Sequence, residues 1–232
     1  MKLLAFETAT EACSVAVWIH GQVRERFELA PRRHAELALP WAEALLAEAG
    51  VAKSQLDAIA VGRGPGAFTG VRLAIAVAQG IALALDRPII PVSTLAALAL
   101  QANARDVLAA IDARMGEVYV GAYRCQNGDA RLLDHERVAK PEDVVLPEGG
   151  TWMGCGTGFG AVDGLLPRTL GDRLQSFDAN ALPHAADIAR LAVHAFARGE
   201  AVAPERAEPA YLRDNVALTL VEQQAARAAR QP

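Results

Sequence analysis

The stretch GRGPGAFTGVRLAIAVAQGIALALD, residues 62–86, decides the fold of this chain. It opens with a glycine-rich turn, and the four apolar residues before that turn are typical of the end of a buried strand. A long apolar helix is predicted to follow, with Thr69 as its N-cap. The helix is predicted to end at Asp86, because a proline lies two residues later and cannot continue it. The stretch therefore predicts a strand, a tight turn and a helix.

The predicted helix is apolar nearly all round, and one row along it consists of small residues that include Ala74, Ala78 and Ala82. Its polar side chains, Arg72 and Gln79, share a narrow strip. A helix without a polar face is buried on more than one side. One face is expected to cover a sheet, and the small row is expected to allow close approach of a second helix, from this chain or another. On periodicity alone, an internal core helix explains the pattern equally well.

The glycine-rich turn does not match the common phosphate-binding or nucleophile motifs. No lysine follows its last glycine, so it is not a phosphate loop. Gly62, Gly64 and Ala67 fit a loose dinucleotide pattern, but the next predicted strand is followed by Ser93 and Thr94 and not by the acid that would hold a ribose. No serine stands in a G-x-S-x-G motif. A tight connection from strand to helix is favoured, although free amides at a helix start can bind an anion.

Bulk properties exclude several classes of function. The 232 residues carry a net charge of −4 without a basic block, which argues against high-affinity nucleic-acid binding by this chain alone. Three cysteines lie far apart, and neither they nor the histidines have the spacing of a metal site, so no metal is predicted. The N-terminus lacks a signal-peptide core, and the apolar helix is judged too short and too polar to span a bilayer. A soluble, cytoplasmic protein without membrane association is expected.

The order of predicted elements indicates a two-lobed α/β fold. The first half is predicted to contain strands at 2–8, 13–19, 23–29, 56–61 and 88–92, and helices at 34–49, 69–85 and 93–103. A meander followed by alternating helices and strands is the ribonuclease H-like lobe of the actin and Hsp70 (ASKHA) architecture. Pro40 is expected to kink the first helix or mark a restart.

The second half partly repeats this pattern, as a reduced and degenerate copy. Its strands are predicted at 107–112, 116–124, 130–134, 151–153 and 174–177, with a helix at 183–198 and a hairpin turn at 127–129. The predicted domains are residues 1–104 and residues 105–232. The last residues, 223–232, are predicted to be a frayed helix or a tail.

A nucleotide cleft between the lobes is one hypothesis for function. Glu7 and Thr8 stand at the tip of the first strand, where relatives of this architecture grip phosphate, and Gly156, Thr157 and Gly158 form the matching loop of the second lobe. ATP or ADP is the ligand in that case, and no other cofactor is indicated. The alternative is that both segments are ordinary polar turns, since neither loop is specific without its partners.

The chain resembles the TsaB family, also called YeaZ, along nearly its whole length. The segments that carry the resemblance are LLAFETAT, RRHAELALPWAEALL, the DAIAVGRGPGAFTGVR segment with its VSTL continuation, IDARMGEVYVGAY and PAYLRDNVA. The resemblance implies a non-catalytic subunit required to place threonylcarbamoyl on adenosine 37 of tRNAs that read codons beginning with A. It implies work with the catalytic paralogue TsaD and the ATPase TsaE, homodimers when TsaD is absent, and contact with tRNA only through the complex.

The resemblance also implies where the partner binds. The family pairs with TsaD through helices of the first lobe, so six residues become candidates for a partner or dimer interface: Leu37, Trp41, Arg72, Ala74, Ala78 and Ala82. TsaD holds a metal with an H-x-x-x-H pair after the fifth strand, where this chain reads Ser93 to Leu98 without a histidine. The competing hypothesis is an independent enzyme, either an ATP-dependent phosphotransferase or a metallopeptidase, the latter an old label of the wider superfamily.

Overall fold

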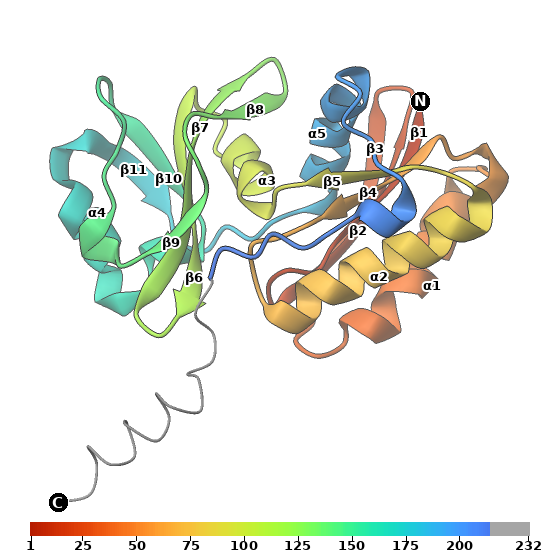
Figure 1. Ribbon diagram of the computed structural model, residues 1–232, viewed down its shortest axis with the longest axis horizontal. Coiled ribbons are helices and arrows are strands. Elements are labelled where there is room, and N and C mark those ends of the chain that lie inside the picture. The colour runs from red at the N-terminus through yellow and green to blue at the C-terminus, as the bar shows by residue number, and fades with distance from the viewer. Residues whose placement is uncertain (214–232) are drawn as a thin grey trace, which may run out of the picture.

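The chain is built on two β-sheets, one from each half of the sequence, which form two lobes joined side by side (Figure 1). The computed structural model describes residues 1–213. The elements of the first half are β1 (Lys2–Glu7), β2 (Ala12–Ile19), β3 (Gln22–Leu29), α1 (His34–Glu48), β4 (Ala58–Gly62), α2 (Phe68–Leu85), β5 (Ile89–Val92) and α3 (Thr94–Gln101). Each element predicted for the first half is present within a few residues of its expected bounds.

The first sheet has the strand order β3-β2-β1-β4-β5. β1, β2 and β3 pair antiparallel, as the short turns between them require, and β4 and β5 run parallel to β1 because helices connect them. Alternate residues of β1 point to opposite faces. Leu4 and Phe6 pack under α1 and α2, while Leu3 and Ala5 pack under α5. The predicted ribonuclease H-like lobe is confirmed.

The second sheet has the order β11-β10-β6-β7-β8, and a short strand, β9, pairs with β7. The elements are β6 (Asp106–Arg114), β7 (Glu117–Gln126), β8 (Asp129–Leu132), β9 (Arg137–Ala139), β10 (Trp152–Cys155), α4 (Leu165–Leu170), β11 (Leu174–Asp178) and α5 (Ala185–Ala197). β9 and α4 were not predicted, because three and six residues carry too little periodicity. This sheet is the reduced lobe that the sequence indicates.

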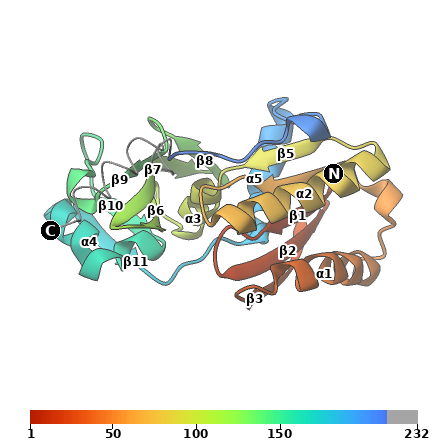
Figure 2. The ribbon, with the colours of Figure 1, turned by 60° about the horizontal axis from the view of Figure 1, so that its bottom comes forward.

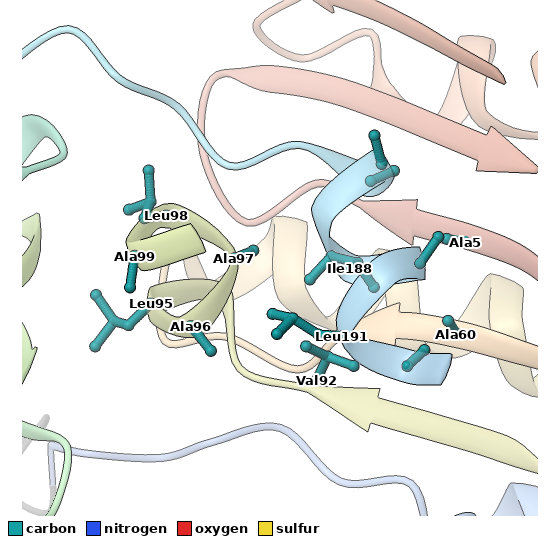
Figure 3. Close-up of a cluster of buried hydrophobic side chains, with 14 of the residues drawn as sticks. Ala5, Ala60, Val92, Leu95, Ala96, Ala97, Leu98, Ala99, Ile188 and Leu191 are labelled. Carbon is teal, nitrogen blue, oxygen red and sulfur yellow. The ribbon is translucent and has the colours of Figure 1, made fainter. Parts of the chain in front are cut away.

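Two helices join the lobes. α3 lies between the sheets and contacts β6, β7 and β8 of the second sheet as well as α5. α5 follows the second sheet in the chain but packs on the first, and Figure 3 shows Ile188 and Leu191 of α5 beside Ala60 and Val92 of the first sheet. The sheets divide near the predicted boundary at residues 104 and 105, but α5 returns to the first lobe. That boundary, as a division between domains, stays a prediction.

Residues 200–213, which we call the C-terminal strap, cross from the first lobe to the second (Figures 1 and 2). Val202 forms a β-bridge with Ile89, and the Gln79 side chain donates hydrogen bonds to two carbonyl oxygens of the strap. Further along, Arg213 donates a hydrogen bond to the Ala113 carbonyl oxygen in the second lobe, at 3.2 Å. The strap therefore ties α2 to the second sheet.

Two expectations about α2 need correction, and one alternative for α1 is excluded. α2 begins at Phe68 and not at Thr69, because the Ala67 amide donates to the Ala9 carbonyl oxygen at 2.7 Å, and this backbone contact sets the start without a side-chain cap. α1 continues through Pro40, so the alternative of a restart is excluded, and the kink stays a prediction. By length and composition alone α2 could cross a membrane, so the judgement that it is too short and too polar was wrong. One face of α2 packs on the first sheet, as in a core helix.

Candidate functional site

A cavity of about 1090 Å³ opens between the two lobes. The N-terminal end of α2 and the turn before α1 form one wall, the end of β6 forms the opposite wall, and the C-terminal strap closes one side. Its lining includes Ala9, Arg32, His34, Phe68 and Arg72 from the first lobe, Ile111, Asp112, Arg114, Tyr119 and Thr157 from the second, and Tyr211 and Arg213 from the strap. The cavity is large enough for a small-molecule ligand.

Arg72 contacts two aromatic rings at the edge of this cavity. Its guanidinium carbon lies 3.1 Å from the centroid of the Phe68 ring and 4.9 Å from that of Tyr211. The guanidinium donates to the Phe68 carbonyl oxygen at 3.2 Å and to the Tyr211 hydroxyl. Cation–π contacts of this kind favour a fixed orientation of the charge. Arg72, predicted as an interface residue, therefore faces the cavity and the strap.

The charges that line the cavity differ in their pairing. Arg114 forms a salt bridge with Asp112 at 2.9 Å, and Arg213 pairs with Glu117. Within residues 1–213, neither Arg32 nor Arg72 has a carboxylate within salt-bridge distance. Arg32 and Arg72 therefore have no ion-pair partner within residues 1–213, although the carboxylate of Glu11 also lines the cavity.

The structure does not place the predicted nucleotide residues of the first lobe in this cavity. Glu7 is 1% exposed, and its carboxylate accepts hydrogen bonds from the Ala9 amide at 2.7 Å and the Thr94 hydroxyl at 2.8 Å. Burial raises the pKa of Glu7 to about 7, against the opposing effect of these hydrogen bonds. Thr8 is fully buried and donates to the Gly70 carbonyl oxygen at 2.7 Å. Both side chains bind the protein's own backbone and side chains.

The glycine-rich turn packs on the segment that follows β1. A Cβ atom at Gly62 would lie 2.0 Å from a Glu7 carboxylate oxygen, and one at Gly66 would lie 2.4 Å from the Ala9 carbonyl oxygen. A Cβ atom at Gly70 would likewise lie 2.0 Å from the Thr8 carbonyl oxygen. Gly66 and Gly70 therefore allow two backbone segments to approach closely, and Gly62 leaves room for the Glu7 carboxylate, as the tight-connection interpretation proposed.

The matching loop of the second lobe is also tightly packed. A Cβ atom at Gly156 would lie 2.2 Å from the Ala110 carbonyl oxygen, and one at Gly158 would lie 2.7 Å from the Ala110 Cβ. Thr157 alone among the five predicted cleft residues lines the cavity, and its hydroxyl accepts a hydrogen bond from the Asp112 amide at 3.1 Å. The predicted nucleotide cleft is therefore corrected to a cavity with a different lining.

Sequence reasoning missed a polar cluster where the lobes meet near α3. Ser93 caps α3, and its hydroxyl oxygen accepts from the Leu95 and Ala96 amides. Glu136, from the loop between β8 and β9, accepts hydrogen bonds from the hydroxyls of Ser93 and Tyr123. Burial and the Glu136 charge raise the pKa of Tyr123 well above its ordinary value. Ser93 was predicted as a cap, but no local pattern marks Glu136, which comes from a distant loop.

The predicted interface on the small row of α2 is wrong for its three alanines. Ala74, Ala78 and Ala82 are 0–1% exposed and lie in the core between α2 and the first sheet. A partner therefore cannot reach them without unfolding this face. Leu37 and Trp41 of α1 are half-buried, so their role at an interface stays a prediction.

The opposite face of α2 is apolar and open to solvent along its middle, with partly buried side chains at its edge. We call it the α2 strip, and it consists of Leu73, Ala76, Val77, Gly80, Leu83 and Ala84. Leu83 is 62% exposed, and a Cβ atom at Gly80 would have no neighbour within 4 Å. A glycine in a helix interior costs about 1 kcal/mol relative to alanine. Nothing within residues 1–213 explains that cost, since no other element approaches Gly80.

The fold defines the class of protein: two linked ribonuclease H-like lobes of the actin and Hsp70 superfamily. The cavity between the lobes has a different lining from the predicted nucleotide cleft. The family model described as "TsaD: tRNA N6-adenosine threonylcarbamoyltransferase" matches residues 27–220. A solved structure of YeaZ from Pseudomonas aeruginosa is similar, with a TM-score of 0.85 and 51% identity, covering 91% of this chain and 99% of that one.

Curated relatives narrow the assignment. The tRNA threonylcarbamoyladenosine biosynthesis protein TsaB of Escherichia coli K12 is 46% identical over 231 residues, which cover 94% of this chain and 96% of that protein. TsaB of Haemophilus influenzae is 37% identical and covers 93% of this chain and 95% of its own length. The chain belongs to the TsaB (YeaZ) family.

Proposed function

We propose that this chain is a non-catalytic subunit in the formation of N6-threonylcarbamoyladenosine at adenosine 37 of tRNAs that read codons beginning with A. In this proposal it binds and activates TsaD together with TsaE in the cytoplasm, and reaches tRNA through that complex. The observation that carries the proposal is the 46% identity to Escherichia coli TsaB over 94% of the chain. That relative is a tRNA threonylcarbamoyladenosine biosynthesis protein by name.

The start of α3 carries a helix cap and a side-chain hydrogen bond at the place where the resemblance puts the histidine pair of TsaD. The start of α3, where TsaD has its histidine pair, is occupied here by Ser93, whose hydroxyl caps the helix and bonds to Glu136. Within residues 1–213, no group of three or more histidine, cysteine, aspartate or glutamate side chains is arranged to hold a metal ion. The three cysteines are free, and burial raises the pKa of each thiol, to about 11 or 12, which disfavours a reactive thiolate.

The α2 strip is the surface that we assign to the TsaD contact, in place of the buried alanines. Ala76, Gly80 and Ala84 recur at intervals of four residues, so they form a shallow row that another helix can approach closely. Leu73, Val77 and Leu83 flank this row with exposed or half-exposed apolar surface. In the absence of TsaD, the same strip would pair with that of a second copy.

Reconstitution tests the function. Purified TsaD, TsaE, the enzyme that makes threonylcarbamoyl-adenylate, ATP and unmodified tRNA are incubated with and without this chain, and the nucleosides are analysed. The proposal predicts multiple-turnover modification only with the chain present, and none with the chain alone. Modification that is equally fast without the chain would contradict the proposal.

A matched pair of variants tests the interface. Leu83→Glu places a charge on the α2 strip, where docking would desolvate it, so TsaD binding in a pull-down is expected to fall at least tenfold. Val145→Glu changes a similarly exposed apolar residue, 74% exposed, in the second lobe and should bind normally. Both variants should melt like the parent chain, because both positions face solvent. Equal TsaD binding by the two variants would refute the strip assignment.

A further inference from the structure

We propose that Glu136 is a conformational latch between the lobes, which holds both the start of α3 and the C-terminal strap in place. Glu136 lies in the loop between β8 and β9 of the second lobe. β8 contacts α3 and α5, so this loop reaches the place where the lobes meet (Figure 1). The proposal rests on contacts within the chain and not on the proposed function, and none of its residues belongs to the α2 strip.

The Glu136 carboxylate has partners in both lobes. It accepts hydrogen bonds from the hydroxyls of Ser93, which follows β5 of the first sheet, and Tyr123, in β7 of the second. Its other oxygen lies 3.8 Å from a guanidinium nitrogen of Arg63, and its side chain is 6% exposed. A buried carboxylate is costly unless it is paired and hydrogen-bonded, so water must replace any partner that leaves. Partly open arrangements are therefore unfavourable, and the latch has two states, closed and solvated.

Ser93 connects the latch to α3. Its hydroxyl oxygen accepts from the Leu95 amide at 3.1 Å and the Ala96 amide at 3.3 Å, while its hydroxyl hydrogen goes to Glu136. A hydroxyl has one hydrogen, so a charged acceptor fixes its direction and leaves its lone pairs for the helix amides. Opening of the latch would free this hydroxyl to turn, and we expect the first turn of α3 to become less stable.

Arg63 connects the latch to the C-terminal strap. Its carbonyl oxygen accepts a hydrogen bond from the Ala210 amide of the strap at 2.8 Å, and its own amide donates to the Val92 carbonyl oxygen at 2.8 Å. Within residues 1–213, Glu136 is the one carboxylate within salt-bridge distance of Arg63. The ion pair therefore restrains the residue on which the strap is anchored, and its loss is expected to loosen the strap near Ala210.

A second ion pair between the lobes provides a matched comparison. Asp129 of β8 pairs with Arg198, at the C-terminal end of α5, at 2.8 Å. The Asp129 side chain is 13% exposed, so it is nearly as buried as Glu136. In the described part of the chain, neither Asp129 nor Arg198 forms a hydrogen bond or ion pair with Ser93 or Arg63. Loss of this pair removes a contact between the lobes but leaves the latch closed.

Hydrogen exchange of the full chain, followed by mass spectrometry, tests the latch. In Glu136→Ala, exchange is expected to become about threefold faster or more both at residues 95–98 of α3 and at residues 207–213 of the strap, because both segments open locally more often. Exchange in α4 and β11 should not change. Asp129→Asn should leave both segments at the rates of the parent chain. Arg63→Gln should affect the strap more than α3, because Ser93 and Glu136 remain hydrogen-bonded.

Melting curves and the exchange of α4 show whether each variant is folded. Glu136→Gln keeps the size of the side chain and an acceptor oxygen but loses the charge that faces Arg63, so it should still loosen the strap if Glu136→Ala does not fold. The proposal is overturned if either segment exchanges at the parent rate in folded Glu136→Ala, or if the strap does so in Glu136→Gln. Equal acceleration by Asp129→Asn would also overturn it, because any loosening between the lobes would then have the same effect. None of these results depends on TsaD binding or tRNA modification.

Discussion

Glu7 makes the stability of this protein depend on pH in a direction that is unusual for a carboxylate. Its folded-state pKa is about 7, raised by burial from the ordinary 4.5. The folded state therefore binds the Glu7 proton more strongly than the unfolded state does. Stability from this residue is complete below pH 4.5 and is lost as pH rises through the folded pKa. Glu7→Gln removes the ionisation and should abolish this loss.

The magnitude follows from the shift. At 1.36 kcal/mol per pKa unit, the rise from 4.5 to about 7 corresponds to about 3 kcal/mol of unfolding free energy lost between about pH 4.5 and pH 7. Glutamine preserves the shape of Glu7, and its amide oxygen can still accept from the Ala9 amide while its NH₂ donates to the Thr94 hydroxyl. The variant should therefore match the parent near pH 5 and exceed it at pH 8.

Urea unfolding at pH 5, 6, 7 and 8 measures the effect as the difference in free energy of unfolding between the Glu7→Gln variant and the parent chain at each pH. Other titrating groups are common to both proteins and cancel in that difference. Glu142→Gln, at an exposed residue of the second lobe, is the control and should show no trend with pH. A difference between Glu7→Gln and parent that stays constant from pH 5 to pH 8 would refute the reasoning.

Further predictions concern packing and one ion pair. Gly70→Ala should destabilise the chain by 1 kcal/mol or more in urea unfolding, since its Cβ would overlap a carbonyl oxygen. Ala78→Glu should unfold the monomer, which calorimetry would show as loss of the melting transition. Gly80→Ala should raise the free energy of unfolding by about 1 kcal/mol. The hydrogen bond to Glu25 raises the pKa of His184, so His184→Gln should lose stability below pH 6.5 and little above the raised pKa, measured by pH-dependent melting.

Much of the fold could be predicted because most elements carry a strong local pattern. The buried strands are continuous apolar runs or alternate cleanly, and Ser93 and Asp86 mark helix ends by their own side-chain and backbone preferences. The start of α2 could not be predicted in this way. It depends on a contact between the Ala67 amide and the Ala9 carbonyl oxygen, two residues far apart in the sequence.

The site could be predicted less well because it depends on which way side chains turn. Glu7 and Thr8 lie where the resemblance to nucleotide-binding proteins puts a phosphate grip, but both turn inward to bind Thr94 and the Gly70 carbonyl oxygen. The cavity instead takes Arg72 and Tyr211, which are 139 residues apart and meet only because the C-terminal strap returns to α2. No local pattern encodes such a meeting.

Two glycines of α2 indicate how the helix is oriented on the first sheet. Gly70 meets the Thr8 carbonyl oxygen so closely that no Cβ fits, which turns its side of the helix toward the first sheet. Ala74, Ala78 and Ala82 follow Gly70 at intervals of four residues, so they must face the sheet as well. Gly80 lies off this row and has open space around it. A small residue there is unexplained by packing within residues 1–213, so Gly80, and not the alanine row, indicates the face that a second helix would approach.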